Sequence, residues 1–366
     1  MNWRKTRRTR RGVTSSVLTG PKTRPAVEVP ALPGRRVLIT GATGFIGSYV
    51  AERLVRGGSQ VRLVVRRPDR AEALRAAGAE VLLGDLTDPP TLQGCCGGIE
   101  IVIHCGAWLG TPYKREVAYA VNVTGTTALA EEALRAGVQR FVHVSSVAVY
   151  GPVPSGVVTE TSPPWKGVHL YGDSKIEGED ALAAISSRGL PTVITRPGIV
   201  YGPRSRGATI QVVRLINRGW PAMVEGGYGY SRPIFVENLV DALVLCAVKP
   251  VTREAFTLID TNMRWRDYLQ YYGRMVGKSP LSVPYLVAWL LAVADETRAF
   301  LTRRQPRIWR RALGYAMSQA VYSTEHARRI LGWTPRYTMD QAMEITKTWL
   351  IENGYLTARR DARSSA

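Results

Sequence analysis

Short apolar runs alternate with longer amphipathic stretches from about residue 37 to residue 200. Most of the apolar runs lack a regular polar face, which is typical of parallel strands that are buried on both sides. The stretches between them have helical spacing, so the pattern predicts repeated β-α units. Six strands are expected, at residues 37–39, 60–65, 78–85, 99–104, 141–146 and 192–196. We therefore predict an α/β fold with a doubly wound parallel sheet, and we expect ligands outside the carboxyl ends of its strands.

The alternation ends after Gly202, where short helices, aromatic residues and prolines replace it. A strand at 232–236 is expected to lead back to a helix of the core at 237–242, whereas 265–349 is expected to form a mostly helical cap. The predicted organisation is a disordered basic tail at 1–34, a sheet domain at 35–202 with a return segment at about 232–260, a smaller and mostly helical C-terminal substrate lobe at 203–231 and 261–352, and a tail at 353–366.

Three glycines follow the first predicted strand and precede a predicted helix at 48–55. Gly41 permits a tight turn, Gly44 lets backbone amides approach a pyrophosphate, and Gly47 lets the helix pack close to the strand. The phosphates would lie at the N-terminus of the helix, where unpaired N–H groups and the helix dipole favour negative charge. Glycines also mark any tight loop, but the surrounding β-α units favour a Rossmann dinucleotide-binding site.

Arg66 and Arg67 end the second predicted strand, about 20 residues after the glycines, where an acidic residue would hold the ribose of NAD. A guanidinium at this place suits the additional 2′-phosphate of NADP. The alternative interpretation is a solvated basic strand end. The sequence therefore predicts NADP as the cofactor, with NAD as the other possibility.

The chain carries a net charge of +20, and strongly basic chains bind polyanions without specificity. Residues 1–36 hold ten Lys or Arg residues and a single acid, and the remaining surplus is spread over the rest of the chain. This distribution argues against a specific nucleic-acid site. Weak attraction to nucleic acid, or peripheral contact with an anionic membrane surface, is expected only as a side effect. The longest apolar stretch, 283–294, is about 12 residues long and too short for a membrane span.

The cysteines and histidines are too scattered to suggest a metal, and none is expected. The four cysteines are expected to be reduced thiols, and the four histidines to have structural roles. No apolar segment follows the basic N-terminus, so we expect no secretory signal and a cytoplasmic location. The residues concerned are Cys95, Cys96, Cys105, Cys246, His104, His143, His169 and His326.

Tyr171 and Lys175 are four residues apart, and on a helix this spacing places them on one face. An ammonium beside a phenol favours the phenolate and lowers its pKa toward neutrality, which suits a general base. Ser145 and Ser146 end a predicted strand, where a hydroxyl would face the ligand crevice. Each feature alone is common, since Tyr and Lys often decorate a solvated helix face and serines often occupy turns. Together with the glycine turn they predict an active site.

The chain resembles the extended branch of the short-chain dehydrogenase/reductase family, which includes nucleotide-sugar epimerases and dehydratases and the 3β-hydroxysteroid dehydrogenases. The matching segments lie in order between about residue 36 and residue 350. They are Gly41–Gly47, Gly84–Leu86, Asn122–Thr126, Val144–Ser146, Val149–Gly151, Tyr171 with Lys175, Arg196–Pro197 and Tyr201–Pro203.

The resemblance implies an NAD(P)-dependent enzyme in which Tyr171 is the acid/base, Lys175 activates it and binds a ribose, and Ser146 polarises the substrate. Asp85 and Leu86 would flank the adenine, and the turn from His104 to Ala107 would line the cofactor, although Cys105 and Gly106 depart from the family pattern. The implied cofactor contacts are Gly41, Thr43, Gly44, Phe45, Ile46, Gly47, Arg66, Arg67, Asp85, Leu86, His104, Ala107, Asn122, Lys175 and Pro197. We also expect a homodimer.

The substrate class is predicted from three features. The segment Gly198-Ile199-Val200 is apolar, whereas nucleotide-sugar enzymes of the family often carry Asn there. The predicted NADP suits an enzyme that releases its cofactor at each turnover, and 284–291 resembles the apolar cap helix of steroid and isoprenoid-alcohol enzymes. We therefore expect hydride transfer to or from a secondary alcohol or ketone on an apolar, steroid- or isoprenoid-like substrate, which Leu286, Trp289 and Leu290 would cover.

Two alternatives remain open. Core packing explains the apolar helix equally well, and Arg204, Arg206 and Arg232 would suit a substrate diphosphate, which leaves a nucleotide-sugar epimerase or dehydratase as the first alternative. The second is a non-catalytic Rossmann protein that senses NADP or binds RNA through its basic tail.

Overall fold

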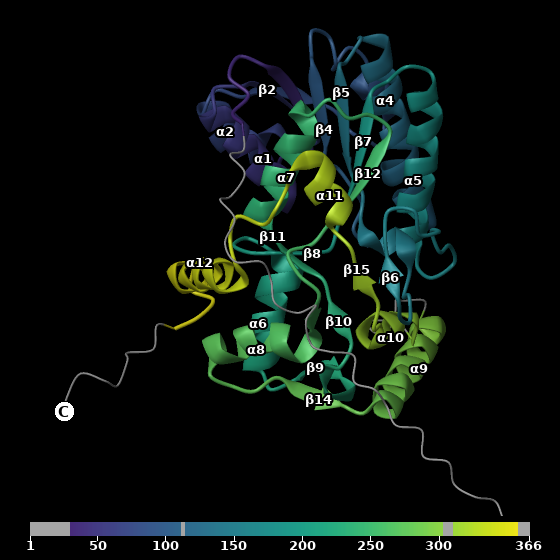
Figure 1. Ribbon diagram of the computed structural model, residues 1–366, viewed down its shortest axis with the longest axis vertical. Helices are drawn as coiled ribbons and strands as arrows, with labels where there is room; N and C mark the ends of the chain where they lie inside the picture. Colours follow the sequence, from purple (N-terminus) through teal and green to yellow (C-terminus); the bar gives the residue numbers. More distant parts are fainter. Residues whose placement is uncertain (1–29, 111–113, 303–309, 358–366) are drawn as a thin grey trace, which may run out of the picture.

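Seven parallel strands form the centre of the molecule. The computed structural model describes residues 30–110, 114–302 and 310–357 (Figure 1). The sheet has the order β12-β7-β5-β4-β1-β2-β3, and each neighbouring pair is parallel. Its strands are β1 (Arg36–Thr40), β2 (Gln60–Val65), β3 (Glu80–Leu83), β4 (Ile101–His104), β5 (Arg140–Val144), β7 (Thr192–Pro197) and β12 (Glu254–Leu258). The predicted doubly wound parallel sheet is confirmed.

Helices cover both faces of the sheet (Figure 1). Alternate residues of β1 point to opposite sides, so Val37 and Ile39 pack in one apolar cluster and Leu38 in the other. The first cluster includes residues of α1 (Phe45–Arg56), α2 (Glu72–Ala76), α7 (Val236–Val248) and α11 (Glu325–Leu331). The second includes residues of α4 (Thr126–Arg135) and α5 (Leu170–Ser187), and α3 (Arg115–Tyr119) also contacts α5.

Two strands beyond the six of the β-α pattern follow later in the chain. The predicted strand at 232–236 is β11 (Pro233–Phe235), which pairs with β8 (Ile199–Tyr201) outside the central sheet. The seventh strand is β12, which the sequence did not indicate as a strand. Part of the predicted tail is also built into the domain, because Leu32 is buried and Gly34 donates a hydrogen bond to Gly58. Residues 1–29 lie outside the described residues.

A smaller group of elements lies beyond the carboxyl ends of the strands (Figure 1). It contains α6 (Val212–Asn217), α8 (Trp265–Val276), α9 (Tyr285–Leu301), α10 (Arg310–Met317), and the strand pairs β9 (Pro221–Val224) with β14 (Leu281–Val283) and β10 (Tyr230–Ser231) with β13 (Met263–Arg264). β6 (Val157–Val158) pairs with β15 (Val321–Tyr322) beside it. These elements form the lobe that the sequence assigns to substrate; its boundaries and role stay a prediction. In the described part of the chain, no helix is both long and apolar enough to cross a bilayer.

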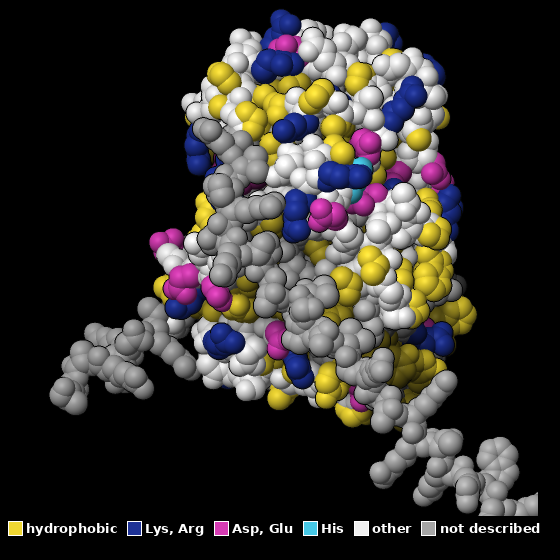
Figure 2. Space-filling view, in the orientation of Figure 1, with side chains coloured by type: hydrophobic (Ala, Val, Ile, Leu, Met, Phe, Trp, Pro, Cys, Tyr) yellow, Lys and Arg dark blue, Asp and Glu magenta, His cyan; other side chains and the backbone are white. Residues whose placement is uncertain are grey.

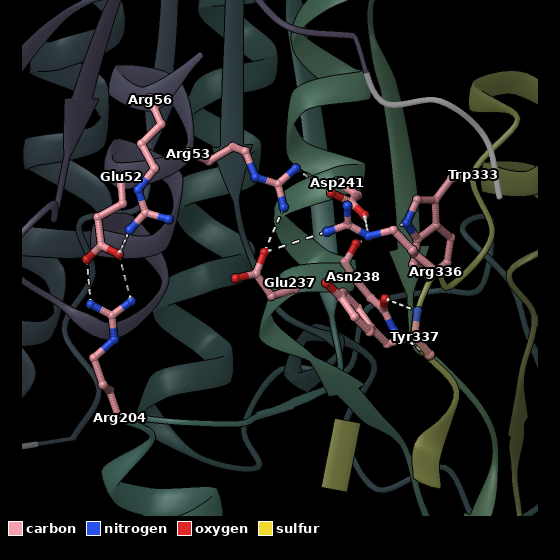
Figure 3. A network of polar contacts seen from close by, with 10 residues as sticks. All are labelled: Glu52, Arg53, Arg56, Arg204, Glu237, Asn238, Asp241, Trp333, Arg336 and Tyr337. Carbon is pink, nitrogen blue, oxygen red and sulfur yellow. Dashed lines mark hydrogen bonds and ion pairs between the residues drawn. The ribbon is translucent and has the colours of Figure 1, made fainter. Parts of the chain in front are cut away.

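A charged network fixes the C-terminal segment to the sheet domain (Figure 3). Arg53 of α1 and Arg336 both bind the carboxylates of α7, and Asn238 of α7 holds the turn that precedes α12 (Met339–Glu352). The contacts are Arg53 with Glu237 at 2.7 Å and Asp241 at 2.9 Å, Arg336 with Asp241 at 3.0 Å, Trp333 Nε1 with the Asn238 carbonyl at 3.0 Å, and the Tyr337 amide with Asn238 Oδ1 at 2.9 Å. Three segments distant in sequence are thereby joined.

Candidate active site

The glycine turn joins β1 to α1 in a space that admits no side chain at two of its three glycines. Gly41 has a φ of +69°, and a Cβ there would lie 2.7 Å from the Gly106 amide nitrogen. A Cβ on Gly47 would lie 2.3 Å from the Gly41 carbonyl oxygen. Gly44 has more room, is exposed, and begins α1 with no side-chain cap. The helix N-terminus therefore presents amides to a concave backbone, which fits the diphosphate of a dinucleotide.

Further residues predicted to contact the cofactor lie in the glycine turn or at the ends of neighbouring strands. Thr43 is exposed, and Phe45 and Ile46 are half-buried in the first turn of α1. The strand order places the ends of β1, β2 and β3 side by side, so Arg66, Arg67 and Asp85 follow along the same edge. Both arginines are exposed. Asp85 is half-buried and accepts a hydrogen bond from the Thr87 amide at 2.9 Å.

The His104 side chain is held by hydrogen bonds within the protein. The ring is fully buried, Nδ1 lies 2.6 Å from the Thr40 hydroxyl, and Nε2 lies 3.0 Å from the Thr126 hydroxyl. Burial lowers the pKa of His104 to about 3, so the ring is neutral. The Thr40 hydroxyl in turn accepts the Gly106 amide at 3.1 Å. The imidazole thus supports the turn between His104 and Ala107 from beneath, and only the backbone of this turn faces the glycines.

Asn122 also acts within the protein. Its side chain is fully buried and bonds both backbone groups of Trp108, at 2.7 Å and 3.2 Å, and the Ser174 hydroxyl of α5 at 2.9 Å. It lies in a π-helical turn, η3 (Ala120–Gly125), between α3 and α4. Its contribution to a cofactor site is therefore to fix the 105–108 turn against α5.

Leu86 and Pro197 border the same space. A Cβ on Gly106 would lie 2.7 Å from Leu86 Cδ1, and a Cβ on Gly125 would lie 2.5 Å from the Leu86 carbonyl oxygen. Leu86 thus fills the gap between these two glycines. Pro197 is buried at the end of β7, on the carboxyl edge of the sheet.

The structure brings Ser146, Tyr171 and Lys175 together. Ser146 follows β5, and its hydroxyl accepts the Ala148 amide at 3.1 Å to begin the short helix η4 (Val147–Tyr150). Tyr171 lies in the first turn of α5, and the Ser146 side chain is near enough to lower the pKa of its phenol. Lys175 lies one turn further along and is 1% exposed, and its Nζ donates to the Val144 carbonyl at 2.8 Å.

Tyr171 is expected from the sequence to have a pKa lowered toward neutrality, but the structure shows the opposite shift. Burial raises the pKa of Tyr171 to about 12, and the nearby Ser146 side chain opposes this only in part. Burial also lowers the pKa of Lys175 to about 8, against the favourable charge of Glu179. The ammonium of Lys175 donates its hydrogen bond to the Val144 carbonyl. Near neutral pH the phenol holds its proton and the lysine is largely charged.

His169 is a residue of the site that the sequence did not indicate. Its Nδ1 accepts the Gly172 amide at 2.7 Å, which caps α5, and its Nε2 lies 3.0 Å from the Tyr315 hydroxyl of α10. Burial lowers the pKa of His169, so Nε2 carries the single proton and donates to Tyr315. The imidazole stacks on both Tyr171 and Tyr315, with ring centroids 6.2 Å and 5.4 Å apart. The lobe thereby contacts the aromatic ring beside the candidate acid.

A buried ion pair lies beneath Lys175. Arg196 of β7 binds both carboxylate oxygens of Glu179, with the shortest contact at 2.6 Å, and Ser145 donates to the same carboxylate. The guanidinium also donates to the Tyr150 hydroxyl at 2.9 Å. Glu179 lies one helical turn after Lys175, so this spacing is the signal that predicts its proximity.

Comparison with known proteins agrees with this geometry. The profile of the NAD dependent epimerase/dehydratase family matches residues 37–258, more than half of the chain. The chain is 27% identical to "Sterol demethylase protein B" of Methylococcus capsulatus over 87% of this chain and 99% of that protein. It is also 27% identical to a "4-hydroxy-2-methyl-3-oxo-4-farnesyl-3,4-dihydroquinoline-1-oxide ketoreductase" of Stigmatella aurantiaca, over 85% and 96%.

Among solved structures, MoeE5 in complex with UDP-glucose and NAD superposes with a TM-score of 0.69 at 26% identity, over 87% of this chain and 99% of that one. The family match includes the glycine turn, Ser146, Tyr171 and Lys175, and the similarity to these proteins extends through the lobe. The chain therefore belongs to the NAD dependent epimerase/dehydratase family, a family of NAD(P)-dependent enzymes.

Proposed function

We propose that this protein transfers hydride between NADP(H) and a secondary alcohol or ketone on an apolar, ring-bearing substrate. The observation that carries the proposal is the proximity of Ser146 and Tyr171, with Lys175 one turn away, at the same sheet edge as the glycine turn. A non-catalytic sensor has no need of this acid and its partners.

The protonation state favours ketone reduction as the direction for which the site is poised. The glycine turn and the strand ends beside it would hold NADPH, whose nicotinamide would supply the hydride for the carbonyl carbon. Tyr171 donates its phenolic proton to the carbonyl oxygen, which Ser146 holds by a hydrogen bond. The phenolate that forms is the unfavourable species, because burial raises the pKa of Tyr171, and the charge of Lys175 compensates it. Alcohol oxidation reverses these steps.

The apolar substrate is supported by residues and by relatives. Ile199 and Val200 of β8 offer no polar side chain. Arg232 is buried, donates to the Ser318 hydroxyl at 2.7 Å and the Ala320 carbonyl at 2.8 Å, and is thus engaged within the protein. Arg204 pairs with Glu52. The two relatives named above carry a sterol and a farnesyl group in their names.

A nucleotide sugar is the second candidate, because MoeE5 binds UDP-glucose and NAD. A panel assay separates the two. Sterol and isoprenoid ketones, their alcohols, and UDP- and dTDP-sugars are incubated with each nicotinamide cofactor, and the reduced-nicotinamide absorbance is followed. Net oxidation or reduction of the cofactor with an apolar substrate supports the proposal. Interconversion of sugar epimers without cofactor consumption would make the second candidate correct.

The choice of NADP rests on Arg66 and Arg67. Both are exposed, and within the described chain the ion pair that involves either of them is the 3.4 Å contact of Arg67 with Asp69. Replacing both by Ala should lower the preference for NADPH over NADH by at least about tenfold, since hydrogen bonds to a charged group are lost. Arg75→Ala, an exposed arginine of α2, is the matched control. Equal binding of both cofactors by the wild-type protein would refute the arginine argument.

A further inference from the structure

Helix α9 packs with its small residues inward and its large apolar residues outward. Ala288, Ala292 and Ala299 are buried, at 6%, 0% and 3% exposure. Leu286 and Leu290, on the opposite side, are 65% and 53% exposed. The same outer side continues through Leu301, with Trp289, Leu291 and Phe300 exposed beside it. These residues form the outer face of α9, and Figure 2 shows hydrophobic side chains gathered at the lower right, where α9 lies in Figure 1.

This arrangement is opposite to that of an amphipathic helix in an ordinary water-facing position, which buries its large residues. No charged residue occurs from 279 to 294, so the exposed face is not a solvated one. Trp220, just before β9, and Leu281 of β14 are also exposed apolar residues of the lobe. Exposed large apolar side chains gathered on one helix face mark a contact with another hydrophobic body.

The charge of the sequence that follows the apolar segment favours an anionic partner. The acids that end the apolar segment are already held, Asp295 by Arg298 and Glu296 by Arg310, each at 2.7 Å. Residues 297–324 contain six arginines, two of which form those ion pairs, and no acidic residue, and the whole chain has a net charge of +20. A second copy would bring equal positive charges together, whereas an anionic bilayer neutralises them. Trp and Tyr side chains in the apolar segment also suit the headgroup region.

We propose that the outer face of α9 docks on the surface of an anionic lipid bilayer, with the helix lying in the plane of the headgroups. The helix is too short to cross, and its alanine side stays packed on the protein. α9 contacts α10, whose Tyr315 bonds His169 beside Tyr171. Only α10 therefore lies between the docked face and the residues beside the candidate acid. Docking would bring the active site close to the bilayer, in which an apolar substrate dissolves. This last step rests on the proposed function; the membrane contact does not.

Vesicle binding tests the proposal without any turnover. The full chain is sedimented with vesicles of phosphatidylcholine and phosphatidylglycerol in equal parts, at low and at high salt. Leu286→Asp/Leu290→Asp keeps every basic residue and should weaken binding by at least about tenfold. Leu83→Asp is the control, because Leu83 is 68% exposed on β3, and it should bind as the wild type does. NADPH affinity, unchanged in the double variant, shows that the variant is folded.

A second measurement tests the proposal even if the double variant does not fold. Brominated lipid should quench tryptophan fluorescence in the wild type more than in Trp289→Phe. Equal vesicle binding by the double variant, or binding that high salt abolishes entirely, would assign the contact to the basic N-terminus and overturn the proposal. Self-association that the double variant loses, without vesicle binding by the wild type, would assign the face to a second copy and overturn it as well.

Discussion

At the scale of single residues, Lys175 links the chemistry of the site to stability. The folded protein lowers its pKa to about 8 by burial, whereas the ordinary value is 10.5. Between these values the unfolded chain holds a proton that the folded chain releases, so the free energy of unfolding rises with pH in this window. Below it, the buried ammonium costs stability.

Lys175→Met should remove this dependence. In cofactor-free protein, the stability of the wild type relative to the variant is expected to rise by up to about 3 kcal/mol from pH 8 to 10.5. Urea unfolding of both proteins across that range measures the difference. Parallel pH profiles would mean that the Lys175 pKa is not lowered.

His169 is expected to position Tyr171. His169→Asn keeps a residue that caps helices well but removes the ring stack and the bond to Tyr315. We expect kcat to fall about tenfold, because the acid is less well oriented, with NADPH affinity and melting temperature nearly unchanged. Tyr315→Phe keeps the stack and should have a smaller effect. Loss of stability in proportion to the loss of kcat would indicate a merely structural residue.

The site residues that the sequence predicts lie within a few positions of one another in a single turn or helix. Gly41, Gly44 and Gly47 follow a strand, and Tyr171 and Lys175 share a helix face, so short-range pattern suffices. The protonation of Tyr171 was not predictable, because it depends on burial. The pair His169 and Tyr315 was hidden too, since 146 positions separate its members.

At the scale of elements, the close packing of α1 against the turn that follows β1 depends on Gly47. Gly47→Ala would place a Cβ 2.3 Å from the Gly41 carbonyl oxygen, so the helix must move. We expect a loss of about 2–4 kcal/mol of stability and of most NADPH affinity. Gly44→Ala meets that oxygen at 3.1 Å and should fold nearly normally while binding NADPH more weakly. Thermal unfolding and NADPH fluorescence titration measure both effects, and equal stability of the two variants would contradict the packing argument.

The strands of the β-α repeats were predictable because each is a short apolar run. β12 was missed, although Ala255, Phe256 and Leu258 are apolar, and it completes the sheet by pairing with β7. The predicted strand at 232–236 is β11, which pairs with β8 and leads directly into α7.

At the scale of the whole molecule, the sheet and the family were predictable, whereas the surface of the lobe was not. Leu286, Trp289 and Leu290 were expected to cover a substrate, which stays a prediction, and in the structure they are exposed on α9. Helical spacing marks an apolar face but not the direction it points, which the packing of Ala288 and Ala292 decides.

The central claim is hydride transfer with Tyr171 as the acid. The most direct test supplies NADPH carrying deuterium at the transferable C4 position, together with the ketones of the panel, and follows the product by mass spectrometry. The account predicts an alcohol one mass unit heavier, with deuterium on the carbinol carbon, and a rate about 10³-fold lower in Tyr171→Phe at unchanged NADPH affinity. Unlabelled product, or full activity of Tyr171→Phe, would contradict it.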